Sequence, residues 1–245
     1  MAGHSKWANI RFRKGLQDSR RGKIFTKLIR EITLAARMGG ADELVNSRLR
    51  DVISKALKAN MKRDTIDNAI KRGVGGPECE HMQEMRYEGY ASGGVAILVD
   101  CLSDNKNRTV SEVRHAFAKR GGNLVAVGSV AYLFENKGEI SLEQNHAEEA
   151  IVEIAIDAGA EDILTNDDQI DIITSVADYH RVLTILQDKE LHIEHSDLVM
   201  RAQVLVPLDK LAADNLMLLI DALEDLDDVQ KVYTNAKFPD DYFRD

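Results

Sequence analysis

The residues best suited to bind another molecule are basic side chains crowded into the first 30 positions of the chain. Asp18 is the only acidic residue before Glu31, although the whole chain of 245 residues has a formal net charge of -9. A block of one sign at one end of a chain is typical of contact with a polyanion. We therefore predict nucleic-acid binding, mainly through phosphates. The predicted contacts are Lys6, Trp7, Arg11, Arg13, Lys14, Arg20, Arg21, Lys23, Lys27 and Arg30.

The charge is divided unevenly along the chain. Residues 1–77 contain 18 Lys and Arg against 7 Asp and Glu, whereas residues 78–245 contain 14 against 34. Residues 136–206 are the most acidic part, with 4 basic and 16 acidic residues. We interpret acidic pairs such as Asp227 and Asp228 as solvated surface or turn residues. The division predicts an oriented molecule whose basic head approaches a polyanion while its acidic body is repelled.

A second group of polar and basic residues lies inside the acidic body, just before a predicted helix. Two interpretations stay open for it. The segment is either a strand-to-helix loop with a helix cap, for which we expect Asn107, or a contact for a phosphate at the helix N-terminus. The possible second contact consists of Asn105, Lys106, Asn107, Arg108 and Arg114.

Residues that could support catalysis or hold a metal are few. His192 and His195 would point to opposite faces of a strand, so they make a poor metal site. Cys79 and Cys101 have no second pair and no CxxC spacing, so neither a disulfide framework nor a zinc site is supported. No Ser/His/Asp or Cys/His arrangement stands out. We expect no enzyme activity, no metal site and no cofactor.

The hydropathy pattern leaves the cytoplasm as the expected compartment. The longest apolar runs, such as residues 216–220, are far shorter than the roughly 20 residues that a membrane helix needs. The first residues lack the apolar core of a signal peptide. We therefore expect no membrane partner.

The basic head is predicted to combine an irregular arm with a small helical bundle. Residues 1–20 have no apolar period, and Trp7 either anchors this arm on the helices or stacks on a base. Helical periodicity follows, with Asn46 as the expected N-cap of the second helix and residues 73–77 as a linker. The predicted helices are residues 23–38, 47–60 and 63–72.

One face of the first predicted helix is basic. At 100° per residue, Lys23, Lys27 and Arg30 lie opposite its apolar residues. We expect this face to stay free for phosphates.

The acidic body is predicted to be α+β. Strands are expected at residues 85–90, 95–102, 129–135, 138–142, 162–165, 169–175, 192–206 and 229–235. Helices are expected at residues 108–119, 147–158, 178–189 and 208–226. The order between residues 137 and 206 is β-α-β-β-α-β, the split βαβ or ferredoxin-like pattern. The elements on either side of it supply a second set of four strands and two helices.

The fold prediction is therefore an N-terminal three-helix domain followed by two split-βαβ domains, one inserted in the other. The predicted domains are residues 1–77, residues 78–135 plus 207–245, and residues 136–206. Such domains can stack bases on sheet aromatics, for which Tyr87, Tyr132 and Phe134 are candidates. The inserted domain is too acidic for direct RNA binding, so a protein partner suits it better.

Several long motifs resemble the YebC/PmpR family. They are MAGHSKWANI at residues 1–10, RGKIFTKL at 21–28, DNKNRTVSEVR at 104–114, GGNL at 121–124, GSVA at 128–131 and LEDLDDVQKVYTN at 223–235. The resemblance spans nearly the whole chain and implies three domains around a cleft, without known catalytic chemistry. Ala91-Ser92 stands where many relatives have Gly-Pro, and Val125 where many have Gly, which affects loop shape.

The resemblance also implies a role in gene expression. The family is described as DNA-binding transcriptional regulators, so a cytoplasmic regulator of that kind is the leading prediction. Other members, including the mitochondrial translational activator of cytochrome oxidase subunit I, resemble translation factors that act on the ribosome. A ribosome-associated factor that binds ribosomal RNA by shape and backbone is therefore the alternative. A protein-binding adaptor is a third class.

Overall fold

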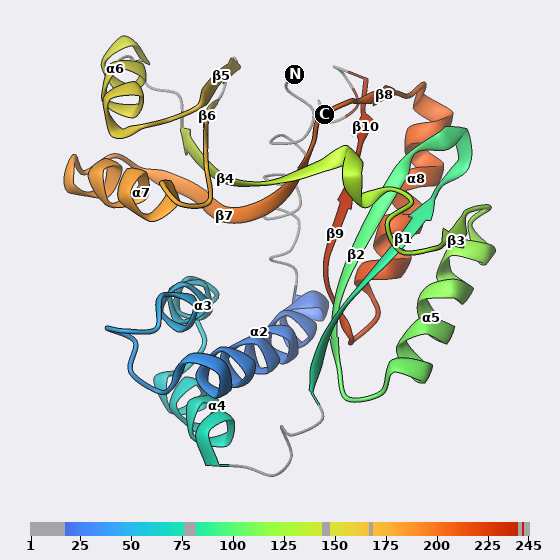
Figure 1. Cartoon of the computed structure of the whole chain (residues 1–245), viewed down its shortest axis with the longest axis horizontal. Coiled ribbons are helices and arrows are strands. Elements are labelled where there is room, and N and C mark those ends of the chain that lie inside the picture. Colours follow the sequence, from blue (N-terminus) through green and yellow to red (C-terminus); the bar gives the residue numbers. More distant parts are fainter. Residues whose placement is uncertain (1–17, 76–81, 144–147, 167–168, 240–241, 243–245) are drawn as a thin grey trace.

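A computed structural model describes residues 18–75, 82–143, 148–166, 169–239 and 242. These residues form a helical head and two α+β units, which lie beside one another (Figure 1). The predicted α+β class is confirmed.

The head consists of α2 (Asp18–Gly39), α3 (Ser47–Lys58) and α4 (Arg63–Gly75). Their buried apolar residues form a cluster that includes Ile32, Leu49 and Ile66, each with none of its surface exposed. Asn46 is the N-cap of α3, as predicted, because its side-chain oxygen accepts a hydrogen bond of 3.0 Å from the backbone N–H of Leu49. The amide of Asn46 also donates to Ala35 O at 2.8 Å, which fixes α3 against α2.

The predicted linker at residues 73–77 is wrong for its first three residues, because α4 continues to Gly75. Gly73 is buried where α4 crosses α2. A Cβ atom there would lie 2.4 Å from Thr33 O and 2.8 Å from Ala36 Cβ. The glycine therefore permits close helix packing rather than ending the helix, and residues 76 and 77 lie outside the described part.

The first α+β unit is a four-stranded sheet in the order β3-β1-β2-β9. Its helices, α5 and α8, share an apolar cluster with one face of the sheet (Figure 1). The strand β9 comes from the C-terminal part of the chain and pairs antiparallel with β2, not with residues 136–206. The elements are β1 (Gln83–Tyr90), β2 (Ala96–Ser103), α5 (Lys106–Lys119), β3 (Asn123–Val125), α8 (Lys210–Glu224) and β9 (Val229–Thr234).

The second α+β unit has the strand order β5-β6-β4-β7, the order of a split βαβ sheet. The first unit differs, because its elements follow one another as β-β-α-β-α-β and its sheet has the chain order third-first-second-fourth. Among the described residues, the predicted split βαβ order is therefore found in the second unit and not in the first. The elements of the second unit are β4 (Phe134–Glu143), α6 (Glu148–Ala158), β5 (Asp162–Asn166), β6 (Gln169–Thr174), α7 (Tyr179–Asp188) and β7 (Ile193–Ala202). A short parallel pair, β8 (Val206–Pro207) with β10 (Ala236–Lys237), follows. The division into domains stays a prediction.

The separate strands predicted at residues 129–135 and 138–142 are wrong. A short 3₁₀ turn at Ala131–Leu133 leads into the single strand β4, which pairs with β7 from Phe134 onward. Gly138 does not break the strand. A Cβ atom there would lie 2.3 Å from Thr174 Oγ1, so the glycine allows the side chains of the neighbouring elements to approach β4.

The predicted base-stacking platform is not formed. Phe134 is buried in an apolar cluster with Ala96, Leu98 and Tyr233, where the two α+β units meet. Tyr87 packs against the helix-covered face of the first sheet. Tyr132 is 68% exposed, but it lies on the 3₁₀ turn and not on a strand.

Candidate functional site

The basic face of α2 is directed at the body of the protein. Lys23, Lys27 and Arg30, which we call the basic row, reach the C-terminal end of α8 and the turn before β9. We call residues 224–228 the docking turn. The expectation that this face is free is therefore not met within the described structure.

Each member of the basic row bonds to the docking turn. Lys23 Nζ donates to Asp225 Oδ1 at 2.8 Å and to Asp225 O at 3.1 Å. Lys27 Nζ donates to Glu224 O at 2.8 Å. Arg30 Nη1 donates to Asp228 Oδ1 at 2.8 Å and to the carbonyl oxygen of residue 227 at 2.6 Å. Cations suit this end of α8, because the last carbonyls of a helix carry the negative end of its dipole.

Asp228 is the centre of the contact. Its side chain is 3% exposed, and its Oδ2 accepts from Ser103 Oγ and Thr109 Oγ1, both at 2.8 Å. Arg108 adds bonds from Nη2 at 2.9 Å and from Nε at 3.2 Å. Burial alone would raise the pKa of Asp228, but the hydrogen bonds from Arg108, Thr109 and Ser103 outweigh it and lower the pKa. The interpretation of Asp228 as a solvated residue is wrong.

The predicted second contact is divided between two roles. Asn105, not Asn107, is the N-cap of α5, because its side-chain oxygen accepts from the backbone N–H of Arg108 at 3.1 Å. Arg108 itself is engaged by Asp228. The side chains of Lys106, Asn107 and Arg114 are exposed. The cap interpretation therefore holds for the loop, and the three exposed side chains stay available for a ligand.

The remaining predicted contacts lie at the start of the chain. Arg20 and Arg21 belong to the first turns of α2. The others, which lie outside the described residues, are Lys6, Trp7, Arg11, Arg13 and Lys14.

The head meets the body through polar contacts. Lys55 Nζ on α3 and Lys231 Nζ on β9 bind the two oxygens of Asp197 on β7, each at 2.7 Å, so one carboxylate joins all three units. Burial by itself would raise the pKa of Asp197, but Lys231 and Lys55 lower it. Arg48 also pairs with Glu84. No sequence signal distinguished these residues, since their partners are far away in the chain.

Apolar packing does not join the head to the body. Among the described residues, the buried cluster of the head contains no body residue, and the other clusters contain no head residue. The two α+β units, by contrast, share an apolar cluster. Among the described residues, the head is therefore joined to the body by ion pairs and hydrogen bonds and not by a shared apolar cluster.

Some basic residues of the head take no part in docking. Lys58, Lys62 and Lys71 are exposed, and within the described residues their side-chain ammonium groups make no hydrogen bond or ion pair. Lys58 is the last residue of α3, Lys62 lies directly before α4, and Lys71 lies on α4. They are available to an external anion.

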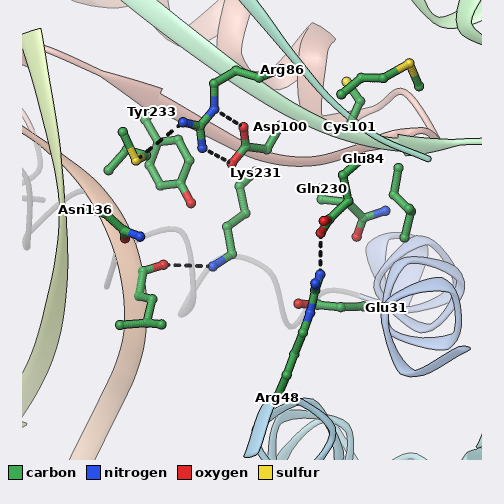
Figure 2. A pocket seen from close by; sticks show the side chains of 14 residues that line it. Glu31, Arg48, Glu84, Arg86, Asp100, Cys101, Asn136, Gln230, Lys231 and Tyr233 are labelled. Atoms are coloured by element: carbon green, nitrogen blue, oxygen red, sulfur yellow. Dashed lines mark hydrogen bonds and ion pairs between the residues drawn. The ribbon is translucent and has the colours of Figure 1, made fainter. Parts of the chain in front are cut away.

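A cavity of about 500 Å³ lies where the three units meet (Figure 2). Its walls carry cations and carboxylates that neutralise one another. Arg86 Nε binds Asp100 Oδ1 at 2.6 Å, and Lys231 Nζ donates to Leu198 O at 3.1 Å. Such a lining does not favour a phosphate, so we place the candidate nucleic-acid interface on the head and not in the cavity.

Neither a metal cluster nor a membrane span is found in the part of the chain that the structure describes. Its residues contain no group of three or more His, Cys, Asp or Glu side chains that could hold a metal ion. No described helix has the length and hydropathy needed to cross a membrane.

Comparisons with known proteins point to one family. Residues 5–76 match the family model described as the TACO1/YebC protein N-terminal domain, and residues 82–236 match the TACO1/YebC second and third domain. A probable transcriptional regulatory protein of Legionella pneumophila (strain Lens) is 69% identical over 97% of this chain and 96% of its own. A protein of the same description from Francisella tularensis subsp. novicida is 54% identical over 97% of this chain and 96% of its own. The crystal structure of a conserved hypothetical protein from Aquifex aeolicus has a TM-score of 0.84 and 43% identity, and covers 93% of this chain and 95% of its own.

Proposed function

Since the chain belongs to the TACO1/YebC family, as its motifs predicted, we propose that it is a regulator of gene expression that binds nucleic acid through its basic head. The names of the Legionella and Francisella relatives support the regulatory part of the proposal. The proposed activity is binding, without catalysis and without a cofactor. The proposed place of action is the cytoplasm.

One observation carries the nucleic-acid part. The head keeps exposed lysines whose ammonium groups make no ion pair or hydrogen bond with the described residues, namely Lys58, Lys62 and Lys71. The rest of the chain carries an excess of 20 acidic charges and repels a polyanion, so the head is the surface that a nucleic acid would meet. Lysines contact phosphates as point charges, which fixes position but reads little sequence.

Duplex DNA is the leading target, because the relatives are named as transcriptional regulators. Ribosomal RNA is the second candidate. The exposed, unbonded cations of the described head are lysines, which contact the phosphates of either nucleic acid, so the same surface also suits RNA recognition by shape and backbone. A protein-binding adaptor is the third class and predicts no affinity for nucleic acid at physiological salt. A protein partner of the second α+β unit, the acidic inserted unit, is compatible with each of the three classes.

A salt series on a variant of the head tests the binding. The variant replaces Lys58, Lys62 and Lys71 with Ala, and anisotropy of a labelled duplex or single strand gives the affinity. Each phosphate that is no longer neutralised reduces the salt slope by about 0.9 for duplex DNA or about 0.7 for a single strand. A variant with Arg13, Lys14, Arg20 and Arg21 replaced by Ala tests the start of the chain in the same way.

The matched control removes the same charge from the body. Lys189, Lys210 and Lys237 are exposed there, and their replacement by Ala gives the same net charge. An equal loss of affinity in the head and body variants would exclude the head as the interface.

A second experiment separates the two targets. Lysate is fractionated on a sucrose gradient with and without ribonuclease. Co-migration with ribosomes that ribonuclease abolishes supports the RNA target. Retention on a promoter fragment over competitor DNA supports the transcriptional one.

A further inference from the structure

We propose that the basic row is a phosphate-binding site which the docking turn occupies in the free protein. The nucleic-acid backbone and the docking turn would then compete for Lys23, Lys27 and Arg30. This inference rests on the proposed function. It adds to the exposed lysines a second phosphate-binding site, which the docking turn covers. It also gives a reason why the acidic body binds the basic head.

The docking turn presents the same chemistry as a phosphate backbone. Its groups that meet the basic row are carboxylate and carbonyl oxygens, held at 2.6–3.1 Å from the three cationic side chains. The row follows the spacing i, i+4, i+7, so its members rise along one face of α2 by about 6 Å and then about 4.5 Å. A row of cations on one helix face can follow a chain of phosphates as well as it follows this turn.

Release of the row leaves no buried charge without partners. When Arg30 departs, Asp228 keeps the bonds from Ser103, Arg108 and Thr109, all of which belong to the body. Arg30 is already 24% exposed in the docked state, so water or a phosphate can replace its partner. The docking turn can therefore be displaced while the body keeps its fold.

The outermost contact is the easiest to exchange. Lys23 is 42% exposed and Asp225 is 64% exposed. Exposed ion pairs contribute little to stability and are screened by salt. A polyanion supplies many charges at once, so it can replace this pair first and then reach Lys27 and Arg30.

The nature of the interface supports such an exchange. The head shares no buried apolar cluster with the body among the described residues, so undocking exposes little core. Interfaces of this kind permit movement between domains. If both use the row, weakening the docking raises the open fraction of the protein and strengthens nucleic-acid binding by up to the factor by which docking is weakened.

The test uses two variants of the full chain with the same change of charge. Asp225→Lys removes the partner of Lys23 and repels it, whereas Asp227→Lys changes an exposed side chain that makes no bond within the described structure. The probes are a labelled duplex DNA and a labelled single-stranded RNA of about 30 nucleotides. We expect Asp225→Lys to bind at least threefold more tightly than Asp227→Lys. Its salt slope should be steeper by about 0.7–0.9 for each additional phosphate that the released row neutralises.

A double-variant experiment tests direct contact. In the wild-type protein, whose basic row is docked, Lys23→Ala should change the affinity for nucleic acid by less than twofold. In the Asp225→Lys protein the same substitution should remove most of the gain in affinity that Asp225→Lys produces. Equal affinities and slopes for the two Lys variants would overturn the inference while leaving the proposed function intact. Absence of binding to either probe by every variant, the wild type included, would instead refute the proposed function.

Discussion

The replacement Asp228→Asn tests whether the buried carboxylate stabilises the fold of the body and the docking of the head. The substitution preserves shape but removes the charge that Arg108, Arg30, Ser103 and Thr109 share. It also turns one acceptor oxygen into a donor that faces other donors. The expected result is a marked loss of stability together with looser docking of the head.

The size of the loss follows from the exposure of the partners. Removing one member of a buried ion pair costs about 3–5 kcal/mol, because the other charge is left buried. Here Arg108 is 43% exposed and Arg30 is 24% exposed, so both can turn to water. We therefore expect about 3 kcal/mol, near the lower limit. For a chain of this size that corresponds to a decrease in Tm of about 6–12 °C.

The dependence on pH gives an independent check. The pKa of Asp228 is lowered in the folded state from its ordinary value of 3.8. Its contribution to stability is therefore fully present above pH 3.8 and is lost as pH falls through the folded-state pKa. The deficit of Asp228→Asn should accordingly shrink below about pH 4.

Urea unfolding followed by circular dichroism at several pH values measures both quantities. Asp227→Asn is the matched control, because it removes the same charge from an exposed neighbour, and it should lose less than about 0.5 kcal/mol. A loss for Asp228→Asn below about 1 kcal/mol at pH 7, or one unchanged in acid, would refute the reasoning.

Three further predictions concern stability and domain movement. Burial raises the pKa of Glu139 to about 7 and lowers that of His195 to about 4. Below pH 6.5 these two groups therefore change the folding stability in opposite directions as pH rises, and above it only Glu139 of the two still changes the stability. The contribution of Glu139 to stability should fall as pH rises from 4.5 through about 7, because in that range the folded state keeps the Glu139 proton and the unfolded state loses it. Glu139→Gln should abolish this fall in a urea series, and an unchanged slope would contradict it. Gly73→Ala should destabilise the head by about 1–3 kcal/mol, because the added Cβ collides with Thr33 O. Its thermal melt is compared with that of Gly75→Ala, a site with open space around the Cβ, where a similar loss would argue against overpacking. Raising salt from about 0.1 to about 1 M should increase the radius of gyration in small-angle scattering as the polar interface weakens, and a constant radius would contradict electrostatic docking.

The sequence predicts well what depends on neighbouring residues. The helical period of Leu28, Ile32 and Leu49 locates the helices of the head, because burial on one face imposes that spacing. Asn46 is found as a cap because an N-cap needs only its own side chain and the next turn of backbone. Asn105 and Asn107 both fit that local rule, and only the structure shows which side chain accepts the bond.

Contacts between distant segments are beyond such reasoning. Nothing local separates Asp228 from Asp227, yet one is buried under donors and the other is exposed. The donors come from residues 103–109 and from Arg30, 198 positions away. Likewise, the basic residues of α2 predict affinity for an anion. Whether that anion belongs to the same chain or to another molecule depends on where the fold places the C-terminal end of α8, which the local sequence does not show.

The docking of the head on the body changes the interpretation of the uneven charge along the chain. From the sequence, the basic head was expected to attract an external polyanion and the acidic body to repel it. In the structure the two charges meet, since Lys23 and Arg30 on α2 and Lys55 on α3 all pair with body carboxylates. The head therefore has two sets of cations, one docked and one exposed.

If the proposed function is right, this arrangement makes nucleic-acid binding and the opening of the head parts of one equilibrium. A nucleic acid that first meets the exposed lysines at the end of α3 and on α4 raises the local concentration of phosphate near the docked row. Each phosphate that replaces a body oxygen weakens the remaining docking contacts, because no apolar cluster of the described residues holds the head in place. The body's acidity then acts in two ways: it closes the free protein, and it repels the phosphates that have displaced it. The head should therefore move away from the body when a polyanion binds, which leaves the acidic unit exposed to a protein partner.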